Sequence, residues 1–262
     1  MSTVRLAWCL LVSQGMRHLI TAIVIALGVG LMTASIATAS GARTAVSSLA
    51  IRFPLVVGGE VGALPLVLGS ITRTQDLPPA VDHDLFEKLE GDERVESVIP
   101  LLGGHAVRGY PLLATTPKYL EPRSRHPLTS GRVFERRASE VVVGHQAALG
   151  LGVSLGDDVV IEHQHAGVPT TPGRLKVVGV LAEVGTDQDR TLFCPLAAIH
   201  ASHGKAADTS ISSLLVRTRD EPALLSLQEE LDALPGMEVA LTRQTLRSLS
   251  HHFSAGGTPL LS

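Results

Sequence analysis

The hydrophobic pattern of the chain changes character near residue 53. Residues 19–39 form an uncharged, strongly apolar run. As a helix rising about 1.5 Å per residue it would span roughly 30 Å, the thickness of a bilayer's hydrocarbon core. Beyond residue 53, short β-rich runs alternate with Gly and Pro. The pattern predicts a cytoplasmic amphipathic segment at 1–18, one transmembrane helix at 19–40 and a domain outside the membrane.

Two β-α-β units are predicted within this outer domain. The first has a helix capped by Asp82, with Val81 and Phe86 placed for a hydrophobic staple, and strands at 55–57, 64–68 and 95–102. In the second, Asp220 and Pro222 open a helix between strands at 211–217 and 237–241. Two such halves, separated in sequence, predict an α+β fold with a ferredoxin-like, split β-α-β core.

The segment between the two units is almost entirely strand and turn. Its strands are predicted at 140–143, 159–163, 175–181 and 191–194. We interpret residues 121–205 as a β-rich subdomain inserted into an α+β subdomain made of 41–120 and 206–250. A polar helix is expected at 242–250 and a flexible tail at 251–262.

Small residues recur every fourth position in the apolar run, at Ala26, Gly30, Ala34 and Thr38. Such a stripe lets another helix approach closely in lipid, although Gly and Ala are also common in membrane helices generally. The stripe predicts helix packing against other transmembrane segments.

The apolar run also has an alternative interpretation, because residues 37–39 followed by Ser40 fit the A-x-A cleavage pattern of a secretory signal. Signal cores are usually about 7–15 residues long, which favours an anchor. The basic residues flanking the run give a slight positive-inside bias with the N-terminus in the cytoplasm: Arg5 and Arg17 before it, Arg43 and Arg52 after it.

Composition narrows the function classes. A net charge of −3 and a pI near 6.4 provide no basic field for nucleic acid. Aromatic residues make up only 3% of the chain, so stacking surfaces for bases or sugars are scarce. Cys9 and Cys194 fall on opposite sides of the predicted membrane helix and are expected to be isolated thiols. A disulfide-free domain of this size is compatible with a bacterial periplasm.

Catalytic motifs are weak. Residues 152–156 match G-x-S-x-G, which would make Ser154 a hydrolase nucleophile, but a helix-like stretch precedes it and a strand follows, so an ordinary turn is favoured. The glycines at 58–62 have no predicted helix after them, which argues against a dinucleotide site. The clusters at 135–137 and 229–230 are interpreted as solvated charged faces.

Histidines are the only candidate metal ligands. His163 and His165 share one strand face, and further imidazoles stand at His145, His200 and His203. No cysteine or carboxylate stands beside them at a ligand spacing, so we expect solvated loop histidines. No catalytic, cofactor or metal site is predicted.

A set of motifs in fixed order carries a family resemblance. They are Gly131-Arg132-x-Phe134, Glu140 to Gly144, residues 147–152, Gly156-Asp157 opening a strand, and residues 177–181 with Gly179. With these residues the chain resembles the N-terminal part of ABC transporter permeases of the MacB and FtsX-like group. The resemblance implies a structural role for Gly131, Arg132, Phe134, Gly144, Gly156, Asp157 and Gly179.

The resemblance also implies an architecture and partners. Such permeases have a transmembrane helix, an external domain with a porter-like half and a β-rich half, and three further helices. We therefore expect this chain to be the N-terminal portion of such a permease, or a truncated or split one. The implied partners are a cytoplasmic ABC ATPase, other transmembrane helices or a second permease copy in a homodimer or heterodimer, and a periplasmic adaptor. The implied location is the bacterial inner membrane. The sequence has no Walker motif, so the ATPase is expected on another subunit. The alternatives are a signal-cleaved secreted binding module and a membrane-anchored hydrolase.

Overall fold

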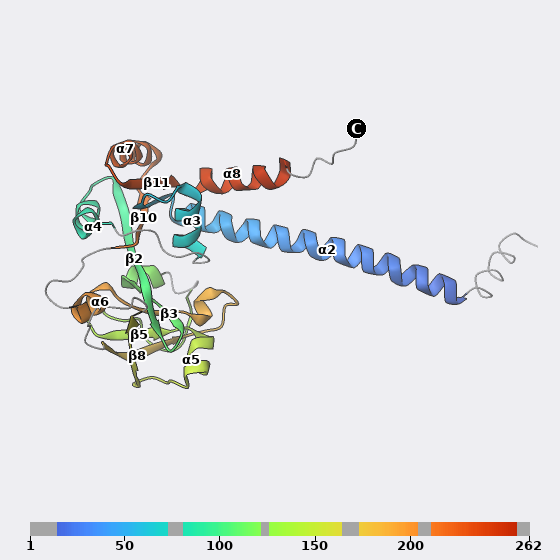
Figure 1. The fold of residues 1–262 in the computed structure, drawn as a ribbon, viewed down its shortest axis with the longest axis horizontal. Helices are drawn as coiled ribbons and strands as arrows, with labels where there is room; N and C mark the ends of the chain where they lie inside the picture. Colours follow the sequence, from blue (N-terminus) through green and yellow to red (C-terminus); the bar gives the residue numbers. More distant parts are fainter. Residues whose placement is uncertain (1–14, 73–80, 122–125, 164–172, 204–210, 256–262) are drawn as a thin grey trace, which may run out of the picture. The chain divides into compact units, whose positions relative to one another are not determined.

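The computed structural model describes residues 15–72, 81–121, 126–163, 173–203 and 211–255 (Figure 1). The chain divides into two units, Met1–Leu49 and Ala50–Ser262. Each unit is described by itself. The predicted segment at 1–18 falls mostly outside the described residues, as do most of the predicted tail, Cys9 and His165.

A single helix, α2 (Gly15–Arg52), contains the predicted transmembrane segment. Its large apolar side chains between Leu19 and Met32 are each at least half exposed. The side chains of residues 36–51, and with them Thr38, lie outside the described ones. Among the residues that the structure describes, no helix has an apolar stretch of the length that crossing a bilayer requires.

Four strands form the first group in the second unit. They are β1 (Leu55–Gly59), β2 (Val95–Val107), β10 (Ser213–Thr218) and β11 (Met237–Leu241). Their order is β11-β1-β10-β2 and every pair is antiparallel. Strands of the two predicted β-α-β units therefore alternate across the sheet, as a split β-α-β core requires.

The helices of these units begin where the sequence predicts. In α4 (His83–Glu90), the side chain of Asp82 accepts a hydrogen bond from the Asp84 N–H at 3.3 Å. In α7 (Glu221–Asp232), Asp220 accepts one from the Ala223 N–H at 2.8 Å. Val81 and Phe86 are both buried in the same core cluster, which agrees with the predicted staple.

The strand predicted at 64–68 is wrong, because these residues belong to a helix, α3 (Ala63–Thr72). Pro65 lies in its first turn, where a missing N–H costs nothing, and the first helical hydrogen bond joins the Leu66 N–H to the Gly62 carbonyl. Leu66, Val67 and Ser70 are buried, a helical spacing. A short apolar run has no periodicity that separates strand from helix, so packing against β11 and α8 (Thr242–Ala255) decides it.

The second group of strands forms a mixed sheet. Its members are β3 (Tyr110–Thr115), β4 (Leu128–Gly131), β5 (Glu140–Val143), β6 (Asp158–Val160), β7 (Glu162–His163), β8 (Arg174–Leu181) and β9 (Leu192–Pro195). The path continues from β2 as β3-β9-β5-β8-β4, with β6 on β8 and β7 on β2. The strands predicted in this region are found, the one at 159–163 divided between β6 and β7.

Short helices connect this second group. They are η1 (Pro117–Leu120), α5 (His145–Leu151), η2 (Asp187–Arg190) and α6 (Leu196–His203). Residues 147–151, which belong to the helix-like stretch predicted before Ser154, lie within α5. Figure 1 shows α5 and α6 beside the strands of this group.

One long strand, β2, belongs to both groups. Its residues from Val95 to Leu101 pair with β10, and those from Leu102 to Val107 pair with β3. β3 in turn pairs in parallel with β9. The hydrogen bonds of β2 with β3 and of β3 with β9 therefore connect the chain as far as Thr115 to the second group of strands. The division into subdomains after residue 120 remains a prediction.

Candidate functional site

The motif around Arg132 that resembles the family connects two segments of the second group of strands by hydrogen bonds. Arg132 Nη1 donates to Glu140 Oε2 at 2.9 Å, and Nη2 contacts the other oxygen of the same carboxylate. The Glu135 N–H also donates to Glu140, at 3.0 Å. The hydrogen bond from Arg132 holds the pKa of Glu140 below its ordinary value. Arg132 therefore ties the segment after β4 to the start of β5.

Two glycines of the motif allow backbones to approach closely. Gly131 has a φ of +79°, and a Cβ there would lie 2.1 Å from the Val178 carbonyl oxygen. A Cβ on Gly179 would lie 2.3 Å from the Arg132 carbonyl oxygen. The Arg132 N–H donates to the Val178 carbonyl at 2.8 Å in the same place. Only glycine fits at either position without moving backbone.

Phe134 and Gly144 also serve packing. Phe134 is 2% exposed in a core cluster that includes Tyr119 and Phe193, whose rings stack with centroids 5.8 Å apart. A Cβ on Gly144 would lie 2.1 Å from the Gln188 carbonyl oxygen. These contacts support the structural role that the resemblance implies, and none of them presents a reactive group.

Gly156 and Asp157 shape the turn that contains Ser154. Asp157 Oδ2 accepts a hydrogen bond from the Ser154 N–H at 2.8 Å, and Gly156 has a φ of +91°. α5 precedes this turn and β6 follows it, the reverse of the strand and helix that a nucleophile elbow requires. His145 and Ser154 line one shallow hollow, but the local order agrees with an ordinary exposed turn.

The structure corrects two predictions, one about the histidines and one about the glycines at 58–62. His145 and His200 are half-buried on α5 and α6, so they are not solvated loop residues. Within the described part of the chain, no three His, Cys, Asp or Glu residues are placed to hold a metal. After the glycines at 58–62 a helix does begin, α3, so the stated ground for rejecting a dinucleotide site is wrong. The spacing there still lacks the G-x-G-x-x-G pattern.

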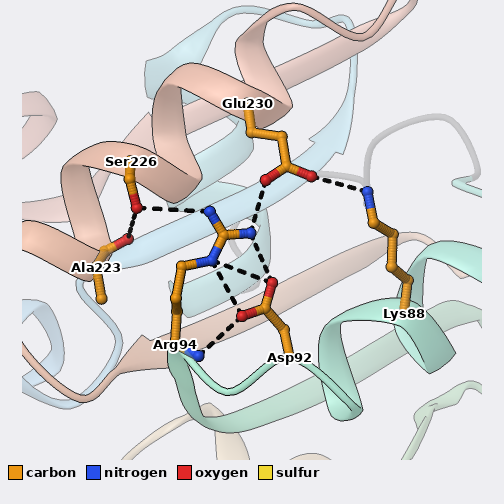
Figure 2. A network of polar contacts seen from close by, with 6 residues as sticks. All are labelled: Lys88, Asp92, Arg94, Ala223, Ser226 and Glu230. Atoms are coloured by element: carbon orange, nitrogen blue, oxygen red, sulfur yellow. Dashed lines mark hydrogen bonds and ion pairs between the residues drawn. The ribbon is translucent and has the colours of Figure 1, made fainter.

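A charge network joins the turn before β2 to α7 (Figure 2). Arg94 Nη2 lies 2.6 Å from both Asp92 Oδ2 and Glu230 Oε2, and Lys88 Nζ donates to the other oxygen of Glu230 at 2.8 Å. The bond from Arg94 lowers the pKa of Asp92. Bonds from Lys88 and then Arg94 lower that of Glu230. Glu230 is therefore part of a structural network, not merely of a solvated face as predicted.

The residues before β1 and those after β11 meet at one corner of the first group of strands. Leu55, at the start of β1, is the register partner of Leu241, at the end of β11. The Thr242 hydroxyl donates to the Phe53 carbonyl at 2.6 Å, and the Thr242 N–H donates to the Pro54 carbonyl at 3.0 Å. The residues that follow α2 and those that begin α8 are thus joined directly.

Arg52 connects the same corner to the second group of strands. Its Nη2 donates to the Tyr119 carbonyl at 2.9 Å and also contacts the Glu121 carbonyl. Its guanidinium lies 4.9 Å from the centre of the Phe53 ring. The residues at the end of α2 and just after it therefore contact both groups of strands. Phe53 and Pro54 make the contacts with the first group, and Arg52 bonds to Tyr119 in the second.

The comparison with protein families decides the identity. The profile of the MacB-like periplasmic core domain matches residues 19–234, most of the chain. The chain belongs to the MacB-like periplasmic core domain family. This confirms the resemblance that the motifs indicate. No curated protein gives a significant match.

One solved structure supports the same fold for this MacB-like domain, and a second is given beside it for comparison. The periplasmic region of MacB from Actinobacillus actinomycetemcomitans aligns with a TM-score of 0.51 at 16% identity, covering 75% of this chain and 92% of that one. The extracellular domain of the noncanonic ABC-type transporter YknZ from Gram-positive bacteria aligns with a TM-score of 0.43 at 16% identity, covering 61% and 89%. At this identity the first likeness establishes the fold alone.

Proposed function

We propose that this chain carries the external domain of an ABC transporter permease of the MacB/FtsX-like type and transmits mechanical movement to that domain. A cytoplasmic ABC ATPase on another subunit supplies the energy, and the domain itself is not catalytic. Membership of the MacB-like periplasmic core domain family supports the proposal.

The observation that carries the mechanical role is the corner at Phe53, Pro54 and Thr242. Because the start of β1 and the end of β11 are paired, a displacement of the residues before β1 or after β11 acts on the same corner. Arg52 extends the connection to the second group of strands. Packed elements joined in this way move together rather than deforming.

The membrane attachment is also part of the proposal. The exposed apolar side chains between Leu19 and Met32 are unfavourable in water, and they surround α2 instead of forming one stripe. We propose that residues 19–40 anchor the chain once in the bacterial inner membrane, with the N-terminus in the cytoplasm and the main domain in the periplasm. The small-residue positions Ala26, Gly30, Ala34 and Thr38 then contact other transmembrane helices, from this permease or from a second copy. A periplasmic adaptor is a further proposed partner.

The location is tested by labelling introduced cysteines in intact cells, with the buried Cys194 left in place. In a Cys9→Ser background, a membrane-impermeant maleimide should label Ser154→Cys in intact cells and Arg5→Cys only after permeabilisation. Mass spectrometry of the mature protein should show an N-terminus that retains residues 19–39. A mature N-terminus at Ser40 would replace the anchored permease with a secreted binding module.

The mechanical role is tested with the ATPase. When the full chain is purified from native membranes in mild detergent, an ABC ATPase should copurify with it. The ATP hydrolysis rate of that ATPase should change at least twofold when the chain is removed. Thr242→Val should reduce this change, whereas Thr245→Val, whose hydroxyl bonds to the Leu241 carbonyl four residues earlier, should not. Absence of any ATPase, or equal rates with and without the chain, contradicts the proposal.

A further inference from the structure

A polar pocket lies where β2 passes between the two groups of strands. Its volume is about 180 Å³. One wall comes from α4, a second from α6, and the segment between β4 and β5 contributes two arginines. The residues used below are His83, Thr115, Thr116, Arg136, Arg137 and His200, all of which line it.

Thr116 places a buried hydroxyl in this pocket. The residue is 7% exposed, and its Oγ1 has no hydrogen-bond partner within the described part of the chain. Thr116 stands at the N-cap of η1, yet its side chain does not cap that helix. A buried hydroxyl normally has a partner, because leaving it unsatisfied costs about 1–3 kcal/mol. The neighbouring Thr115 shows the ordinary case, since its hydroxyl donates to the Pro100 carbonyl at 2.8 Å.

The Nδ1 atom of His83 is a second buried polar atom with no partner among the described residues. The other ring nitrogen lies 3.8 Å from Glu87 Oε1, and the ring meets that of His200 edge-on with centroids 5.7 Å apart. An imidazole nitrogen can donate or accept a hydrogen bond, so the Nδ1 atom offers a second polar group to a ligand in the pocket.

The charged groups around the pocket are predominantly cationic. Arg136 makes a two-pronged ion pair with Glu90, at 3.1 and 2.8 Å, which fixes its guanidinium beside Phe86. Arg137 is exposed, and no ion pair is seen for it among the described residues. Among the described residues that line the pocket, Glu87 is the only carboxylate. Donors from a hydroxyl, imidazoles and a guanidinium are the groups that bind oxyanions.

We propose that this pocket binds a small oxyanion, a carboxylate or a phosphate group. The volume is roughly that of six water molecules, at about 30 Å³ each, and is smaller than the about 300–1,000 Å³ of pockets for drug-sized ligands. The ligand therefore inserts an anionic group rather than a whole lipid or a long peptide. The Thr116 hydroxyl and the Arg137 guanidinium are its main donors. Because helices from both groups of strands line the pocket, a bound anion connects them, a role distinct from the permease function proposed above.

Titration calorimetry on the full chain in detergent micelles tests the proposal, with sodium phosphate in one arm and sodium succinate in the other, at constant ionic strength. At least one anion should bind saturably with one site per chain, and the arm that binds identifies the source. Thr116→Val and Arg137→Gln should each weaken the binding at least fivefold. The control Arg174→Gln, at an exposed arginine on β8 outside the pocket lining, should leave it within twofold.

Unfolding measurements separate a ligand donor from a structural hydroxyl. Without ligand, Thr116→Val should retain or raise the midpoint of urea unfolding, because no bond within the described chain is lost. Thr115→Val should lower it. Absence of saturable binding by both anions, equal binding by the variants, or a loss of stability in Thr116→Val as large as that in Thr115→Val overturns the proposal.

Discussion

Thr242 and Phe53 are 189 residues apart in sequence, yet the Thr242 hydroxyl donates to the Phe53 carbonyl at 2.6 Å with the threonine fully buried. This bond closes the corner at which the chain enters β1 and leaves β11. A hydroxyl here cannot exchange its partner for water without opening the corner. The contact therefore reports both the stability of the domain and the integrity of the link between α2 and α8.

Thr242→Val should lower the free energy of unfolding by about 1–3 kcal/mol, because the nearly isosteric valine leaves the Phe53 carbonyl buried without this donor. Thr245→Val is the matched control. Its hydroxyl bonds to the Leu241 carbonyl four residues earlier, so its loss should cost less than about 0.5 kcal/mol. Urea unfolding followed by circular dichroism measures both. Equal losses in the two variants would show that the corner contributes no special stability.

Gly131→Ala should destabilise the domain by about 3 kcal/mol or more, since a left-handed backbone is combined with a methyl group 2.1 Å from the Val178 carbonyl oxygen. Gly152→Ala separates the two effects. Gly152 is also left-handed, with a φ of +66°, but nothing lies within 4 Å of its Cβ position, so the cost should be only about 1–2 kcal/mol. Thermal unfolding compares the two variants. A smaller loss in Gly131→Ala than in Gly152→Ala would contradict the close approach.

Arg94→Gln should destabilise the protein more at pH 7 than at pH 3. The pKa values of Asp92 and Glu230 are lowered in the folded state. Folding therefore favours their ionised forms, and the stabilisation is present above their unfolded pKa values of about 4 and lost as the pH falls through the lower folded values. Urea unfolding at a series of pH values should show the difference between wild type and variant narrowing as the pH falls below about 4.

Arg217→Gln is the control for this pH experiment. It removes an ion pair with Glu96 in which both side chains are about half exposed. Because exposed pairs contribute little, the variant should stay within about 0.5 kcal/mol of wild type at every pH. A pH-independent loss in Arg94→Gln would assign its effect to packing instead of charge.

Cys194 should resist modification until the domain unfolds. The residue is completely buried, and burial raises the pKa of its thiol, which suppresses the reactive thiolate. In Cys9→Ser, where Cys194 is the only thiol, a maleimide should react at least a hundredfold more slowly in buffer than in denaturing urea. Ser154→Cys in the same background supplies the exposed comparison. Native labelling as fast as that of the Ser154→Cys thiol would contradict the burial of β9.

Local signals explain which elements were predictable. Asp82 and Asp220 mark helix starts because a capping carboxylate acts within three residues, and the strands at 140–143 and 237–241 follow from short-range patterns. The segment at 64–68 failed because Leu, Val and Pro in a short run satisfy either structure. Its helical form depends on burial of Leu66 and Val67 against elements distant in sequence.

Local sequence patterns were also insufficient to predict the candidate sites. Gly131, Arg132 and Phe134 were singled out through a family resemblance, and they contact Val178, Glu140 and the aromatic cluster, while the structural role implied for them stays a prediction. Nothing in the local sequence indicated the network of Lys88, Arg94 and Glu230 or the pocket at Thr116. The network includes the Arg94–Glu230 pair, 136 positions apart, and the pocket is lined by residues between His83 and His200, so no spacing rule could identify either.

By itself the sequence determined the α+β class, the two β-α-β units and the family, because caps, turn residues and apolar alternation act over a few residues and the family motifs keep their order along the chain. The tertiary structure alone decided that α3 is a helix, that β2 serves both groups of strands, and that Thr242 closes on Phe53. These features depend on which distant surfaces pack together, and that packing free energy is not encoded in any local pattern.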